Sequence, residues 1–197
     1  MAVLIVVVVL IALVLLYVVW RYNSLIRLRA RTQEAWSDID VELKRRHDLI
    51  PNLVATTQGY AAHERAVFDE VTQARAAAVS AGQSGNPATI AGAEDALTGS
   101  VNRLFAVAER YPDLKASQVF ITLQEQLTTT EDKVEFSRRF YNGNVRDFNT
   151  ALQRFPTSVI ATSLGFQPFT FFQAAEADRA VPAVSFNGNA PQTPASP

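Results

Sequence analysis

Few residues in this chain have side chains that could do chemistry. The sequence contains two histidines, His47 and His63, and no cysteine, which removes thiolate nucleophiles, thiolate metal ligands and disulfides. Glu64 directly follows His63, and a histidine beside a carboxylate can act as an acid–base pair. A surface histidine next to a helix-face glutamate explains the same two residues more simply, and we adopt that interpretation.

Metal and cofactor sites also lack their usual residue patterns. A carboxylate-bridged di-iron bundle uses Glu-x-x-His on two helices, but Lys44 precedes His47 at this spacing and Tyr60 precedes His63. No glycine-rich phosphate loop is present, and the net charge of −1 gives no reason to expect a nucleic acid. We therefore predict a non-enzymatic protein with no catalytic residue, metal, cofactor or small-molecule substrate.

Four charged residues occupy helix positions at which apolar residues are expected. Arg46 and Glu64 lie in one apolar frame, and Glu131 and Arg138 lie in a second. Together they are a candidate for a buried polar layer, which would fix the register of packed helices or bind a ligand. The alternative is the commoner one, in which long charged side chains reach water from the edge of an apolar stripe.

The first of these frames requires a helix that continues past a proline. Residues at seven-residue spacing remain in one frame from Trp36 to Ala78, across Pro51. A proline in a helix interior removes one hydrogen bond and costs about 3 kcal/mol, and a clean break would reset the frame. We predict one helix over about residues 24–80, kinked at Pro51. Two helices hinged there, with Asp48 as the cap, are the alternative.

Further helices follow in the second half of the sequence. Asn86 and then Pro87 form a typical helix start, with a cap followed by proline at the first helical position, and this helix extends to about Arg110. The next helix has apolar residues at seven-residue spacing as far as Phe155. A short helix over 157–164 completes an all-α fold, an antiparallel bundle of three long helices and one short helix.

The amino-terminal run, residues 2–20, is apolar or aromatic throughout. As a helix it would extend roughly 28 Å, close to the hydrocarbon thickness of a bilayer of about 30 Å. This pattern predicts a transmembrane anchor at residues 1–22. A cleaved signal peptide is the alternative, but the run has no basic region before it and no small-residue cleavage site after it.

Arginines follow the apolar run at once. By the positive-inside rule they place the carboxyl side of the anchor in the cytoplasm. They could also contact anionic lipid headgroups, although we favour a role in topology alone. These residues are Arg21, Arg27, Arg29 and Arg31.

Aromatic residues gather after the last long helix. Such density usually closes the end of a bundle core, and any exposed part would form an interaction patch. The residues concerned are Phe166, Phe169, Phe171 and Phe172. The composition then changes, so we expect a helical domain over 23–173 and a flexible tail over 174–197.

Several segments resemble the LemA family of bacterial membrane-anchored proteins. They include EAWSDIDVELKRRHDLIPNLV, GYAAHE, NRLFAVAERYPDLKA and TEDKVEFSRRFYN, and the resemblance covers almost everything from Tyr22 to Phe172. It implies a single-pass protein of the bacterial plasma (inner) membrane, with its amino terminus outside and a helical domain in the cytoplasm. Some family members are associated with magnetosome membrane formation, so the resemblance also implies membrane organisation. It supplies no catalytic residues.

The function predicted from these features is a scaffold or adaptor. An anchor, apolar helix stripes and little chemistry favour a protein that organises a patch of membrane or recruits partners, with membrane lipids and a protein partner or further copies of itself as expected contacts. One alternative is a signalling element whose kink at Pro51 switches between two packings. Another is an accessory factor of a membrane protease or envelope process.

Overall fold

The computed structural model describes residues 1–173, so the predicted tail lies outside the described residues. The described chain is entirely helical or irregular and has no strand. Helix α1, Ala2–Gln58, joins the apolar run to the bundle without interruption and continues through Pro51. Two helices hinged at the proline, with Asp48 as cap, are therefore not observed. Among the described residues, α1 is the helix long and apolar enough to cross a membrane, by length and composition.

The prediction that the first bundle helix reaches residue 80 is wrong. Helix α1 ends at Gln58, a turn follows, and α2 (Arg65–Gly82) runs back along the bundle. The carbonyl of Thr57 accepts hydrogen bonds from the backbone N–H groups of Tyr60 and Ala61 at 3.1 and 2.9 Å, which closes the turn. Val71 and Ala78 are buried in the same core as the end of α1. The heptad frame therefore continues across a reversal of direction that periodicity cannot detect.

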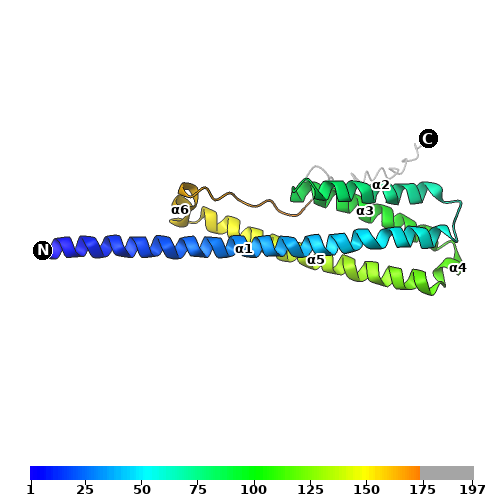
Figure 1. Cartoon of the computed structure of the whole chain (residues 1–197), viewed down its shortest axis with the longest axis horizontal. Coiled ribbons are helices and arrows are strands. Elements are labelled where there is room, and N and C mark those ends of the chain that lie inside the picture. The colour runs from blue at the N-terminus through cyan, green and yellow to red at the C-terminus, as the bar shows by residue number, and fades with distance from the viewer. Residues whose placement is uncertain (174–197) are drawn as a thin grey trace, which may run out of the picture.

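The remaining helices are α3 (Pro87–Ala108), α4 (Pro112–Lys115), α5 (Gln118–Gln153) and α6 (Thr157–Ser163). Asn86 caps α3 as its sequence predicts, because its side-chain oxygen accepts a hydrogen bond from the N–H of Ala88 at 3.0 Å. Figure 1 shows α1 and α5 side by side along the bundle, with α2 and α3 as a second antiparallel pair and α6 at the end nearest the apolar run. The all-α class is confirmed.

Two apolar clusters fill the bundle. The first lies around the turn between α1 and α2 and includes Leu53, Phe68, Leu104 and Phe120. The second lies nearer the apolar run and includes Ile39, Tyr141, Val145 and Phe172. Apart from Phe172, which follows α6, these side chains are on the inward faces of α1, α2, α3 and α5, which is why each of these helices shows helical spacing of apolar residues.

The phenylalanine-rich segment closes the second cluster. Phe172 is buried, while Phe166, Phe169 and Phe171 are half-buried. Phe166 and Phe169 lie edge-on to the ring of Phe148 in α5, at centroid distances of 6.3 and 5.2 Å. Phe172 is therefore part of the core, whereas an interaction patch on the exposed parts of the other three rings remains a prediction.

Two asparagines of α5 hold this segment by its backbone. Asn149 donates to the carbonyl of Phe169 at 2.8 Å and accepts from its N–H at 2.9 Å. Asn142 makes the same pair of bonds with Phe172, at 3.1 and 2.8 Å. The segment thus satisfies its buried backbone groups without forming a helix or a strand.

Tyr141 offers a test of this closure. Its hydroxyl donates to the carbonyl of Thr170 at 2.8 Å, and burial raises its pKa from 10.0 to about 12. Because the fold favours the neutral phenol, this contribution to stability is complete below pH 10 and is lost as the pH rises from 10 towards 12. Tyr141→Phe should cost about 1 kcal/mol at neutral pH and reduce the alkaline loss. The measurement is urea unfolding of the full chain in detergent at several pH values.

The control for this experiment is Tyr60→Phe, because Tyr60 is exposed in the turn after α1. That variant should keep both the stability at neutral pH and the alkaline loss of the parent protein. A Tyr141→Phe variant with an unchanged alkaline profile would contradict the assigned role.

Candidate functional site: a buried ionic cluster beside an acidic groove

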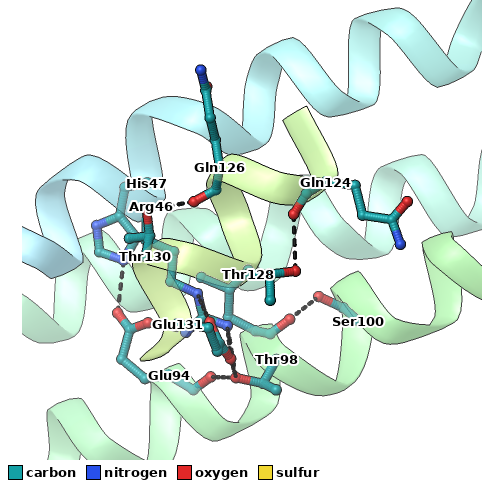
Figure 2. Close-up of polar contacts among 11 residues, drawn as sticks. Arg46, His47, Glu94, Thr98, Ser100, Gln124, Gln126, Thr128, Thr130 and Glu131 are labelled. Carbon is teal, nitrogen blue, oxygen red and sulfur yellow. Dashed lines mark hydrogen bonds and ion pairs between the residues drawn. The ribbon is translucent and has the colours of Figure 1, made fainter. Parts of the chain in front are cut away.

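Arg46 of α1 is buried in the middle of the bundle and joins three helices. Its Nη1 donates to Oε2 of Glu94 in α3 at 2.8 Å, and its Nη2 donates to Oγ1 of Thr98 at 2.7 Å. Its Nε lies 3.0 Å from Oε2 of Glu131 in α5. Figure 2 shows the guanidinium between these partners. A buried cation is tolerated only when paired in this way.

His47 completes the cluster on the other side of Glu94. Its Nε2 lies 2.7 Å from Oε1 of Glu94, so the two carboxylate oxygens of Glu94 bind different residues of α1. Since a carboxylate only accepts, Nε2 is the ring nitrogen that carries hydrogen in this arrangement. We refer to Arg46, His47, Glu94, Thr98 and Glu131 as the ionic cluster.

The proline of α1 is compensated next to this cluster. Pro51 has no backbone N–H, so the carbonyl of His47, four residues earlier, lacks its helical donor. Nε of Arg75 in α2 donates to that carbonyl at 2.6 Å. The hydrogen bond that the proline removes is thus replaced by one from a neighbouring helix, and α1 continues to Gln58. The predicted kink at Pro51 remains a prediction.

The structure brings together two of the four residues of the predicted polar layer, Arg46 and Glu131. Glu64 lies in the turn before α2 and accepts from Arg110 at 2.8 Å, because the chain reverses there. Arg138 lies two helical turns beyond Glu131 on α5 and contacts Glu135 at 3.5 Å. Neither residue belongs to the ionic cluster.

The sequence interpretation missed Glu94 as the main partner of Arg46. A signal was present, because Glu94 falls between Ile90 and Leu97 at the spacing of the buried face of α3. A lone carboxylate at such a position indicates a buried cationic partner elsewhere in the fold. The partner's identity depends on tertiary packing, which the spacing of one helix does not reveal.

A groove runs between α1 and α5 on the surface next to the cluster. Its cavity of about 500 Å³ is lined by acidic and apolar side chains, among them Asp38, Val41, Glu42, Asp132 and Phe136. Phe136 is 67% exposed, and Val41 is also exposed. We call this region the α1–α5 groove.

Glu42 gives the groove an incompletely satisfied acid. Its Oε1 lies 3.8 Å from Nζ of Lys133, which is longer than a hydrogen bond. Its Oε2 is buried and has no hydrogen-bond partner within residues 1–173. Such a buried atom is costly to leave without a donor. The lining also holds three acids, Asp38, Glu42 and Asp132, and one base, Lys133, so the charge of the groove is complementary to a ligand with cationic groups.

The pKa of Asp40, on the exposed side of α1, is raised by burial, and a hydrogen bond with Trp36 opposes that rise. Asp40 lines a second cavity of about 320 Å³ together with His47, Arg75 and Glu94.

Among the described residues, no group of three or more histidines and acids could hold a metal ion. The contacts of Arg46 in the ionic cluster join α1 to α3 and α5.

The arginines predicted to meet lipid all lie on α1 just after the apolar run. Arg21 is half-buried, and its Nε donates to the hydroxyl of Tyr17 at 3.0 Å. The guanidinium also lies over the ring of Trp20, 5.0 Å from its centroid. Arg27, Arg29 and Arg31 are exposed. Their contact with lipid headgroups remains a prediction.

The model of the LemA family matches residues 35–186 of this sequence. The chain belongs to the LemA family. The match includes the helices that carry the ionic cluster and the α1–α5 groove. The apolar helix and the family together indicate a membrane protein.

Relatives of the chain include both LemA and magnetosome proteins. Magnetosome protein MamQ 2 of Paramagnetospirillum magneticum is 26% identical over 176 residues, covering 78% of this chain and 65% of the relative. MamQ of Magnetospirillum gryphiswaldense is 24% identical, covering 77% and 64%. Protein LemA of Metamycoplasma hominis is 29% identical over 162 residues, covering 82% and 73%. The chain thus spans slightly less than two thirds of the length of the MamQ relatives.

The replacement of the proline's missing bond can be tested by a double-mutant cycle. Arg75→Met should cost about 1–3 kcal/mol, because the carbonyl of His47 loses its donor. In a Pro51→Ala background the new backbone N–H of residue 51 can donate to that carbonyl, so Arg75→Met should cost less than half as much. Urea unfolding of the four proteins measures the coupling. Equal costs in both backgrounds would show that Arg75 does not compensate the proline.

The ionic cluster predicts that the loss of Arg46 destabilises the fold more than the loss of Glu131. Arg46→Met should destabilise the fold by about 3–5 kcal/mol, because it leaves Glu94 buried without its cation. Glu131→Gln should cost far less, because its side chain is 43% exposed and water can replace the pair. The midpoints of urea unfolding compare the two variants. A larger loss for Glu131→Gln than for Arg46→Met would contradict the assignment.

Proposed function

We propose that this protein is a non-enzymatic adaptor, anchored by α1 in a bacterial plasma membrane, that recruits a protein partner into the α1–α5 groove. The observation that carries the proposal is the exposure of Phe136 and Val41 beside the incompletely satisfied Glu42. Apolar side chains in a concave surface, with polar groups at defined points, are typical of binding sites. The bundle therefore recruits through α1 and α5 rather than through the phenylalanine-rich end.

The chemistry of the groove defines the partner. The acids Asp38, Glu42 and Asp132 face one base, Lys133, across the groove lining. This balance favours a partner segment with basic residues. A groove between two antiparallel helices that lie side by side suits an amphipathic helix that places apolar side chains over Phe136. We therefore propose an amphipathic helix with lysine or arginine beside its apolar face.

The orientation of the anchor belongs to the same proposal. The arginines after the apolar run favour a cytoplasmic position for the bundle, so the partner would be cytoplasmic or have a cytoplasmic segment. Some relatives are named magnetosome proteins, and an adaptor bound to a membrane is compatible with that name. The anchor keeps the groove close to a membrane surface and thereby concentrates the partner there.

Photo-crosslinking in intact cells tests the groove. A photoreactive phenylalanine replacing Phe136 should give a discrete crosslinked product that contains this chain and one other protein. The same residue at exposed Val119, at the start of α5, serves as the control and should not give that product. Products of equal yield at both positions, or a product containing only two copies of this chain, would contradict the proposal.

Charge substitutions in the same assay distinguish the effect of an acid in the groove from the effect of any acid on the surface of the bundle. Glu42→Gln should reduce the yield of the crosslink at position 136 several-fold, because the basic group of the partner would no longer meet the carboxylate of Glu42. Glu125→Gln alters an exposed acid of α5 outside the groove lining and should leave the yield unchanged. Equal yields in the two variants would remove Glu42 from the recognition site.

A signalling role is a second candidate, favoured by the bond between Arg75 and the carbonyl of His47. It makes the path of α1 around Pro51 depend on α2, so a change in one helix would reach the other. If the protein signals in this way, Pro51→Ala should change the crosslink yield at position 136 while the helical content measured by circular dichroism stays the same. An unchanged yield would rule out the signalling role and keep the adaptor role as the one proposal.

A further inference from the structure

The end of the bundle that contains α6 lies at the level where the apolar run of α1 stops. Phe166, which follows α6, packs edge-on against Tyr22 with centroids 6.1 Å apart. Arg21 and Thr157 line one shared cavity of about 500 Å³. Figure 1 shows α6 as the element of the bundle nearest the amino-terminal part of α1. Any membrane that α1 crosses therefore ends beside α6.

This end of the bundle exposes large apolar side chains within ten residues. Phe155 is 83% exposed, Val159 is 60% exposed and Leu164 is 53% exposed. They flank or belong to α6, whose buried residues are Thr157 and Ala161. The short helix thus packs Thr157 and Ala161 against the bundle. Val159 on its outer face, with Phe155 and Leu164 on either side of the helix, forms a cluster of exposed large apolar residues, and such clusters mark interaction or membrane sites.

Basic residues surround the same region. The cavity shared by α1, α5 and α6 is lined by Arg21, Arg146 and Arg154 and by one acid, Asp147. Arg146 and Arg154 are exposed, and neither has an ion pair described within residues 1–173. Apolar side chains beside unpaired arginines are the composition of segments that lie in the interface of an anionic membrane.

We propose that residues 154–164 form a second membrane contact. Phe155, Val159 and Leu164 enter the boundary between headgroups and acyl chains, and Arg146 and Arg154 bind the phosphates of anionic lipids. The proposal rests on α1 crossing the membrane, as the proposed function does, but it does not require a protein partner. Two contacts would hold the bundle at a fixed height and tilt against the membrane, whereas α1 alone would leave the tilt free.

Spin labels measure the depth of each position directly. The protein has no cysteine, so single-cysteine variants of the full chain can be labelled and reconstituted in phosphatidylcholine vesicles with or without phosphatidylglycerol. With phosphatidylglycerol, labels in Phe155→Cys and Val159→Cys should be more accessible to oxygen than to a water-soluble nickel complex. This would place them about 5–10 Å into the interface. Phe136→Cys, also an exposed phenylalanine, is the matched control and should label a position in water.

A label at Leu10→Cys in the apolar run tests whether α1 crosses the membrane, separately from the second contact at residues 154–164. If it lies deep in the bilayer while the labels at 155 and 159 lie in water, the second contact is overturned and the anchored adaptor stands. If the label at position 10 also lies in water, both proposals are overturned.

The arginines are tested by a double substitution. Arg146→Gln with Arg154→Gln should abolish the increase in depth at position 155 caused by phosphatidylglycerol. Arg138→Gln with Arg139→Gln changes two arginines elsewhere on α5 and should preserve it. An increase that survives the first pair of substitutions would overturn the assignment of these arginines as the lipid-phosphate contact.

Discussion

The position of α1 against the other helices depends on one buried cation, Arg46. Its guanidinium must meet Glu94 on α3 and Glu131 on α5 at the same time, and a shift of α1 by one turn would leave charges buried without partners. Glu42 lies one turn before Arg46, and Asp132 follows Glu131. The internal pairing therefore sets which residues of α1 and α5 face each other across the groove.

Because α1 is continuous, the position that the ionic cluster sets for the bundle is also set relative to the apolar run. One helix of 57 residues contains the apolar run, two members of the ionic cluster, Arg46 and His47, and one wall of the groove. Pro51 would interrupt it near the far end, but Arg75 supplies the missing donor from α2. A continuous helix transmits position and rotation better than a hinged pair, so the groove and α6 take defined places relative to the apolar run. The two proposed contacts, with partner and lipid, use this geometry.

The sequence predicts the parts of this structure that depend on local pattern. The apolar run, the cap at Asn86 and the helical class follow from composition, spacing and capping chemistry. The reversal after Gln58 does not, because Val71 and Ala78 keep the heptad frame of α1 although they lie on a helix of opposite direction. The path of the phenylalanine-rich segment also depends on tertiary structure, because Asn142 and Asn149 of α5 hold the backbone of Phe172 and Phe169 by hydrogen bonds. Arg46 and Glu131 could be singled out as charged stripe residues, whereas Glu94 could be identified as the partner of Arg46 only in the packed bundle.

The central claim is that the α1–α5 groove recruits another protein to the membrane. The most direct measurement is the mass and composition of particles gently extracted from native membranes with the tagged full-length chain. The account predicts a complex of this chain with one other protein in fixed ratio, and a Phe136→Asp variant that folds but loses that protein. Particles made only of this chain and lipid, or a complex unaffected by Phe136→Asp, would contradict it.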